Sequence, residues 1–153
     1  MNVLLDTNIL ARLAEPGTVA SQVAHDAVRA LPLRGDVPCL VPQVLYELWV
    51  VATRPVAANG LGFTPAQADA ELARVLTLFP LFFPDTAAIF PEWRRLVVAH
   101  QVSGRNAHDT RLVAAMAVHG LTHLLTFNTA HFARFPGITV LDPAVIAVAP
   151  PPP

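Results

Sequence analysis

The chain opens with a short aliphatic segment, residues 3–5, that leads straight into Asp6, Thr7 and Asn8. Three aliphatic residues with no polar face are typical of a strand that is buried on both sides in a parallel sheet. Asp6 would then stand at the carboxyl end of that strand, where open α/β sheets form their ligand crevices. An aspartate here equally suits the N-cap of the helix that follows. Capping and ligand binding are therefore alternative roles for Asp6.

Short apolar segments recur along the chain between stretches of helical periodicity. Besides the first strand, we predict strands at residues 39–41, 124–126 and 138–141. We predict helices at residues 8–14, 21–31, 42–54, 65–78, 86–101 and 108–119. Strands that alternate with helices form βα units. The sequence therefore predicts an α/β fold with a mainly parallel sheet of four or five strands and helices on both faces.

Local signals refine this prediction. Thr7 and Asn8 are the predicted caps of the first helix, and Ser21 is the predicted N-cap of the second. The helix at 42–54 is apolar nearly all round, including Val50, which predicts a buried helix. The helix at 86–101 has a predicted buried stripe that includes Phe90.

We expect one domain over residues 1–142 and a Pro-rich tail over residues 143–153, disordered at its end.

Composition limits the classes of function. The net charge of -1 excludes a generally basic nucleic-acid binder, so any contact with phosphates must come from a local patch, and all ten cationic side chains are arginines. No apolar run reaches the roughly 18 to 20 residues that span a bilayer, and no basic leader precedes the first strand. We therefore expect a cytosolic protein without a membrane partner. With 54% hydrophobic and 14% charged residues, exposed apolar surface and an oligomer are expected.

Two further acids stand where a solvated acid is unexpected. Glu47 lies among the valines on one side of its predicted helix, although its stem alone could pack there while the carboxylate reaches water. Asp109 projects to the centre of the apolar arc of its helix, and its place in the first turn also suits an N-cap. Asn128 follows the strand at 124–126 as Asp6 follows the first strand; alone it is typical of a turn. Carboxylates that converge can hold Mg²⁺ for phosphodiester chemistry.

These residues, in this order, resemble the PIN-domain family, and the match is closest to VapC-type toxins of prokaryotic toxin–antitoxin pairs. The resemblance rests on five short motifs spread over almost the whole chain: Leu5-Asp6-Thr7-Asn8, Glu47, Asp109, Thr126-Phe127-Asn128 before His131-Phe132, and Phe135-Pro136-Gly137-Ile138 to Asp142-Pro143. It implies a Rossmann-like three-layer α/β/α domain that cleaves RNA with Mg²⁺ or Mn²⁺. It also implies a homodimer and a small antitoxin protein whose tail lies in the cleft.

The resemblance assigns roles to individual residues. Asp6, Glu47 and Asp109 would be the metal ligands, with Asn8 and Thr126 as supporting polar groups. Asn128 would occupy a fourth catalytic position that is often aspartate, and His131 replaces an acid that is common just downstream. The implied mechanism is in-line hydrolysis by a metal-activated water. Our candidates for contact with RNA are Arg12, Arg54, Arg105 and Arg111.

Three hypotheses follow for the function. The first is a metal-dependent endoribonuclease toxin. The second is a PIN-fold module that binds RNA or a partner without cutting, motivated by Asn128 and His131. The third is a phosphotransferase of the aspartyl-phosphate type, which is disfavoured because those enzymes carry a second acid where Asn8 stands. No Gly-rich phosphate loop is present, which argues against a nucleotide-dependent enzyme.

Overall fold

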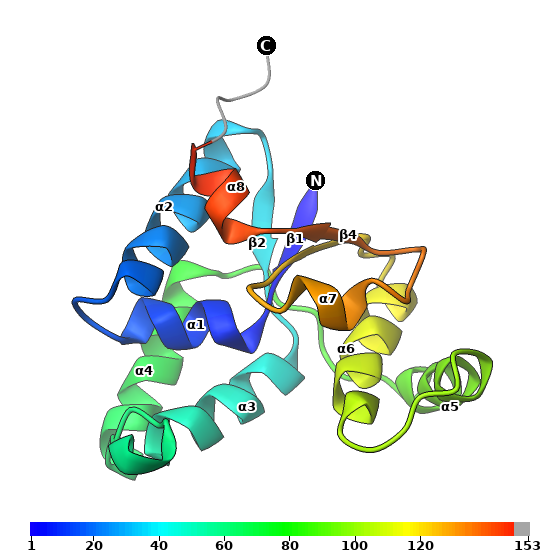
Figure 1. The fold of residues 1–153 in the computed structure, drawn as a ribbon, viewed down its shortest axis with the longest axis horizontal. Helices are drawn as coiled ribbons and strands as arrows, with labels where there is room; N and C mark the ends of the chain where they lie inside the picture. The colour runs from blue at the N-terminus through cyan, green and yellow to red at the C-terminus, as the bar shows by residue number, and fades with distance from the viewer. Residues whose placement is uncertain (149–153) are drawn as a thin grey trace.

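A computed structural model describes residues 1–148 and shows a central sheet surrounded by helices (Figure 1). In chain order its elements are β1 (Asn2–Leu5), α1 (Thr7–Ala14), α2 (Val19–Leu33), β2 (Val37–Cys39), α3 (Pro42–Thr53), a 3₁₀ turn (Val56–Ala58), α4 (Pro65–Leu78), α5 (Ile89–Ala99), α6 (Asn106–Val118), β3 (His123–Leu125), α7 (Thr129–Phe132), β4 (Thr139–Leu141) and α8 (Pro143–Val148).

The sheet has four strands in the order β2-β1-β3-β4, and every pair is parallel. The residues of β1 that follow Asn2 are fully buried, because helices cover both faces of the central strands. Leu4 pairs with Cys39 on one side and Leu124 on the other, which places the carboxyl ends of β1 and β3 side by side. The predicted α/β class with a parallel sheet is confirmed, with four strands.

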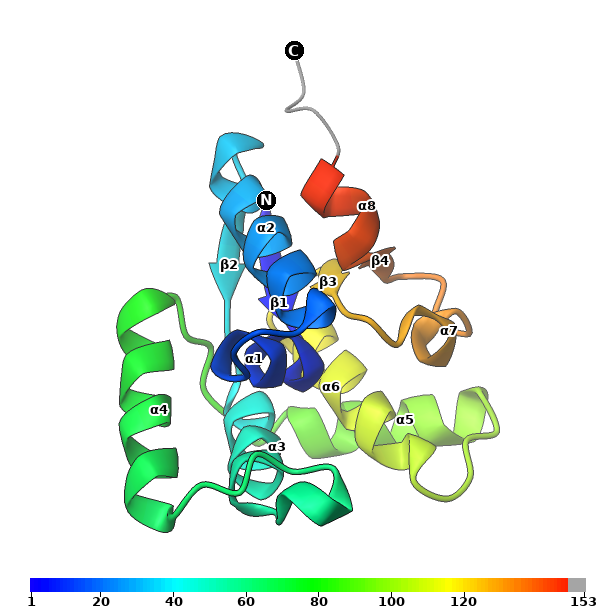
Figure 2. The ribbon, with the colours of Figure 1, turned by 60° about the vertical axis from the view of Figure 1, so that its left-hand side comes forward.

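Helices flank the sheet in two layers (Figures 1 and 2). The α2 and α8 helices lie on one side of β1, and α5 and α6 lie on the other. At the carboxyl end of the sheet, α1 leaves β1 and α3 follows β2, so that the first turns of both helices lie at one edge. This arrangement directs the residues that follow β1 toward those on α3.

Two element boundaries differ from the prediction. Strand β2 covers Val37–Cys39 rather than 39–41, because Leu40 leaves the sheet and pairs with the segment at Phe82. Helix α2 begins two residues before Ser21, and the N-cap is Thr18, whose hydroxyl accepts a hydrogen bond from the Ser21 amide at 3.0 Å.

Two apolar helices are less buried than predicted. On α3, Tyr46 is 64% and Val50 is 53% exposed, so the expectation that this helix is buried all round is wrong. On α5, Phe90 is 65% exposed and does not belong to the buried stripe, which Ile89 and Leu96 form. Large apolar side chains of both helices thus remain at the surface of the single chain.

Residues 143–148 were expected in the tail, and the structure corrects this. They form α8, which packs against α2 and buries Ile146. Residues 149–153, where we expected disorder, lie outside the described part of the chain. Of the helices in residues 1–148, none has the length and apolar character needed to cross a membrane.

Candidate active site

Asp6 stands where strand β1 ends and helix α1 begins. Its backbone amide donates to the Leu125 carbonyl at 3.1 Å, which extends the pairing of β1 with β3 by one residue. Asp6 is also the N-cap of α1, because its Oδ1 accepts a hydrogen bond from the Thr7 amide at 2.7 Å. The prediction that Thr7 and Asn8 supply the cap is wrong, since both side chains have other partners. Asp6 caps the helix and lines a cavity at the same time.

Two polar side chains hold the second carboxylate oxygen of Asp6. Oδ2 accepts hydrogen bonds from Asn8 Nδ2 at 2.8 Å and from Thr126 Oγ1 at 2.6 Å. Asn8 Oδ1 accepts from the Phe127 amide at 3.1 Å, and Thr126 Oγ1 accepts from the Asn128 amide at 3.0 Å. The two predicted supporting residues, Asn8 and Thr126, therefore meet at Asp6 and fasten the ends of β1 and β3 together.

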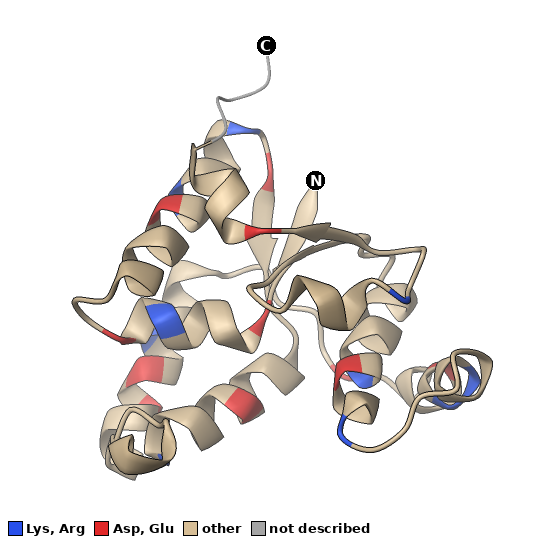
Figure 3. Ribbon diagram, in the orientation of Figure 1, with Lys and Arg blue, Asp and Glu red and all other residues tan. Residues whose placement is uncertain are grey.

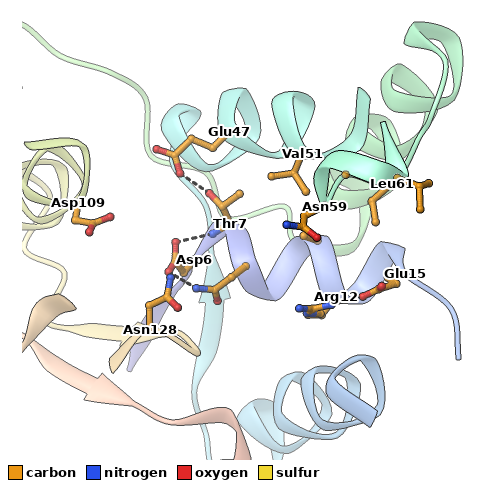
Figure 4. Close-up of a pocket in the computed structure, with 14 residues that line it drawn as sticks. Asp6, Thr7, Arg12, Glu15, Glu47, Val51, Asn59, Leu61, Asp109 and Asn128 are labelled. Atoms are coloured by element: carbon orange, nitrogen blue, oxygen red, sulfur yellow. Dashed lines mark hydrogen bonds and ion pairs between the residues drawn. The ribbon is translucent and has the colours of Figure 1, made fainter. Parts of the chain in front are cut away.

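Glu47 projects from α3 toward the end of β1 (Figure 4). Its Oε2 accepts a hydrogen bond from Thr7 Oγ1 at 2.8 Å, and its Oε1 accepts from Gln43 Nε2 at 2.9 Å. The carboxylate is thus held on both oxygens, and one of its two partners, Thr7, directly follows Asp6 in the chain. This link between α1 and α3 depends on the tertiary fold, so no local pattern could have predicted it.

Gln43 was not identified from the sequence, although it lies one helical turn before Glu47. It is 6% exposed, and its Nε2 also donates to the His108 carbonyl on α6 at 2.9 Å. Its Oε1 accepts from Arg111 Nη1 at 2.9 Å, and Arg111 Nη2 donates to Asp85 at 3.0 Å. One buried amide therefore joins α3, which carries Glu47, to α6. The i, i+4 spacing was the only signal available in the sequence.

Asp109 lies in the first turn of α6, next to the carbonyl that Gln43 holds. Its Oδ2 is 3.1 Å from His131 Nδ1 on α7. The carboxylate is partly exposed and lines the same cavity as Asp6. His131, which stands where relatives were expected to carry an acid, is therefore a direct neighbour of a candidate ligand.

A single cavity of about 500 Å³ brings the predicted residues together (Figure 4). Asp6, Glu47, Asp109 and Asn128 all line it, and they come from the end of β1, from α3, from α6 and from the turn before α7. Figure 3 shows the acidic positions on these separate elements around the carboxyl end of the sheet. The fold therefore gathers carboxylates that are far apart in the sequence.

The surroundings of Asp6 disfavour its charged form. The pKa of Asp6 is raised from 3.8 to about 6, chiefly by burial and to a smaller extent by the nearby charges of Glu47 and Asp109. The hydrogen bonds from Thr126 and from the Thr7 amide act in the opposite direction. A cation in the cavity would favour the ionised carboxylate.

The donor set agrees with a hard divalent cation in its chemistry. Within residues 1–148, no three Asp, Glu, His or Cys side chains are gathered closely enough to form a complete metal cage. Mg²⁺ does not need one, because it keeps several waters and usually takes only one or two protein carboxylates. The buried Asp6 carboxylate, with two more carboxylates lining its cavity, meets that requirement.

Comparison with known proteins agrees with this geometry. Residues 3–138 match the PIN domain family. The chain belongs to that family. The match includes every residue assigned to the cavity from the sequence, and it confirms the family resemblance.

Several solved structures have the same fold as this PIN domain. VapBC2 of Rickettsia felis, bound to a DNA fragment from its promoter, is 16% identical with a TM-score of 0.69, over 92% of this chain and 98% of that one. Mycobacterium tuberculosis VapC20, a sarcin-ricin loop cleaving toxin, is 20% identical with a TM-score of 0.66. The similarity covers 87% of this chain and 95% of that one. FitAcB of Neisseria gonorrhoeae is 22% identical with a TM-score of 0.62. The similarity covers 92% of this chain and 97% of that one. These likenesses establish the fold. No curated protein matches the chain.

The four arginines predicted to contact RNA take different positions in this PIN domain. Arg12 lines the cavity and forms an ion pair with Glu15. Arg111 is held by Gln43 and Asp85 behind Glu47. Arg54 ends α3 and Arg105 precedes α6, both exposed and outside the cavity lining. Of the four, only Arg12 lines the cavity, and it does so beside Glu15, away from the three carboxylates.

Proposed function

We propose that this PIN domain is a metal-dependent endoribonuclease that acts as the toxin of a toxin–antitoxin pair in the cytoplasm. The observation that supports it most is the meeting of Asp6, Glu47 and Asp109 in one cavity at the carboxyl end of a parallel sheet. Ligand sites of open α/β sheets lie at this edge. VapC20, which has the same fold, is a sarcin-ricin loop cleaving toxin, and its cleavage activity is in line with the proposal.

Mg²⁺ or Mn²⁺ is the proposed cofactor; of the three acids predicted as its ligands, Asp6, Glu47 and Asp109, one or two would bind it directly and the others through its waters. When bound, such a cation lowers the pKa of water and offsets negative charge on a phosphodiester and its leaving oxygen. The protein's part is to orient the carboxylates: Asn8 and Thr126 fix Asp6, and Thr7 and Gln43 fix Glu47. Asn128 supplies an uncharged amide at the fourth catalytic position. The reaction is in-line hydrolysis and needs no nucleophilic side chain.

An antitoxin protein and a second copy of the chain are the proposed partners. A toxin–antitoxin complex from Klebsiella pneumoniae has the same fold. Large apolar side chains remain exposed on α3 and α5, among them Tyr46, Phe90 and Val98, and association would remove this surface from water.

A second candidate function is a binding module without catalysis. The contact between His131 and Asp109 favours it, because the histidine occupies one oxygen of a candidate ligand. The two functions differ in their response to chelation. Cleavage that needs Mg²⁺ and stops with EDTA would reject the binding module.

The test compares two acids that line the same cavity. Glu47 is proposed as a ligand, whereas Glu15 lies near the other end of α1 and forms an ion pair with Arg12. Purified wild type should cut single-stranded RNA with Mg²⁺ or Mn²⁺. Glu47→Gln should reduce cutting at least a hundredfold, and Glu15→Gln should leave it within about threefold. Equal activity of Glu47→Gln and the wild type would contradict the assignment.

A further inference from the structure

The cavity is larger than the carboxylate site and has a second end of different chemistry. Its volume of about 500 Å³ is within the range of sites that hold small organic molecules, beyond what one cation and one phosphate fill. At the far end its lining includes Val51, Asn59, Leu61 and Arg12. We call these four residues the Asn59 end. Figure 4 shows their side chains around the space between α1 and the segment that follows α3.

The distance between the two ends suits one nucleotide. Helix α1 forms one wall throughout, from Asn8 beside the carboxylates to Arg12 at the Asn59 end. Four helical residues advance roughly 6 Å. This is comparable to the spacing of neighbouring phosphates in an extended single strand. A phosphate held at the carboxylates would therefore place an adjoining nucleotide at the Asn59 end.

The wall that carries Asn59 is held in place. After the 3₁₀ turn the chain folds back on α3, with the Leu61 amide donating to the Val51 carbonyl at 3.0 Å and the Gly62 amide to the Arg54 carbonyl at 2.9 Å. Gly60 is required by this packing, because a Cβ atom there would lie 2.0 Å from the Arg54 carbonyl oxygen. Asn59 itself has a left-handed φ of 62°. The amide is thus presented by a folded segment.

The chemistry of the Asn59 end favours a base over a phosphate. Arg12, its cation, is already paired with Glu15, so the pair carries no net charge. Val51 and Leu61 offer apolar surface for the face of a ring. The Asn59 amide offers a donor and an acceptor, and it makes no hydrogen bond to the other lining residues in Figure 4. Unpaired bases are recognised by contact with their faces and hydrogen bonds to their edges.

We infer that the Asn59 end is a subsite for the nucleobase of one unpaired nucleotide next to the scissile phosphate, and that Asn59 reads the edge of that base. The inference rests on the proposed ribonuclease function. It names a specificity-determining residue at the same site and implies a base preference at one position beside the cut.

The test uses a substitution that keeps the backbone conformation at residue 59. Asn59→Gly removes the amide while glycine retains the left-handed conformation. Gln101→Gly is the matched control, because Gln101 also has positive φ, at 49°, and lies outside the cavity lining. A pool of single-stranded RNAs of random sequence is cut with Mg²⁺ by the wild type and each variant, and the cut ends are sequenced. kcat/KM is then measured on the preferred RNA.

The wild type should prefer one base, or one pair of bases, at one position beside the cut. Asn59→Gly should flatten that preference and lower kcat/KM on the preferred RNA roughly tenfold, while Gln101→Gly changes neither. A wild type without base preference, or an unchanged preference in Asn59→Gly, would overturn the inference and leave the proposed function standing. No cutting by the wild type would contradict the proposed function itself.

Discussion

Asp6 combines two roles at the scale of a single residue. One oxygen caps α1, the other joins the ends of β1 and β3, and the whole carboxylate lines the cavity. Capping alone would be served by a solvent-exposed aspartate, whose pKa would be near its usual value. Burial raises the pKa of Asp6 to about 6 instead. The site therefore carries a destabilising charge at neutral pH, as is common for functional carboxylates.

This raised pKa predicts how stability depends on pH in metal-free buffer. Between pH 3.8 and about 6 the folded protein keeps a proton on Asp6 that the unfolded chain has released. The stability that this proton contributes is present below pH 3.8 and is lost as pH rises through about 6. The free energy of unfolding of the wild type, minus that of Asp6→Asn, should therefore fall over this range. Urea unfolding with EDTA at pH 4 to 8 measures it, and a difference that rises with pH would contradict the assignment.

Gln43 is expected to position Glu47. Gln43→Leu removes the hydrogen bonds to Glu47 and to the His108 carbonyl, so the spacing between α3 and α6 is less well defined. The Mn²⁺ concentration for half-maximal cleavage should rise roughly tenfold, as for other residues that orient metal ligands. Thr110→Val is the control, because buried Thr110 donates only to the Asn106 carbonyl within α6. An unchanged Mn²⁺ requirement in Gln43→Leu, measured where both variants are folded, would leave Gln43 with a purely structural role.

At the scale of elements, α8 shows how packing decides a short helix. Six residues are too few to form a stable helix alone, and the prolines on either side favoured a tail. The helix forms because Ile146 is buried where α8 packs against α2. No local pattern contains this information. The start of α2 is a smaller case, since Thr18 and Ser21 are both acceptable caps and tertiary context selects Thr18.

Truncation of Ile146 should show that α8 belongs to the folded domain. Ile146→Ala removes a side chain that is 4% exposed, and the free energy of unfolding should fall by about 2 to 4 kcal/mol. Val145→Ala, at a neighbouring position that is 60% exposed, should change it by less than about 0.5 kcal/mol. Equal urea midpoints for the two variants would mean that α8 does not pack on α2 in solution.

At the scale of the whole molecule, the part of the site that the sequence could predict lies on strands and helices that local sequence patterns identify. The aliphatic segment before Asp6 and the strand before Asn128 predicted side chains at one edge of a parallel sheet, and the cavity contains both residues. Thr7 and Gln43 could not be assigned, because their partners on α3 and α6 become neighbours only after folding. The Asn59 end was unpredictable for the same reason: it joins a loop after α3 to the outer turns of α1.

The most direct test of the proposed function is single-turnover cleavage of a single-stranded RNA at saturating Mg²⁺ by the wild type and Asp6→Asn. Asparagine keeps the size of the side chain and one oxygen for the α1 cap, and it removes the charge that a cation would need. The wild type should cut with a rate that EDTA abolishes, and Asp6→Asn, shown to be folded by circular dichroism, should cut at least a hundredfold more slowly. Cutting by Asp6→Asn at the wild-type rate, or cutting by the wild type that persists in EDTA, would contradict a metal-dependent ribonuclease built on this cavity.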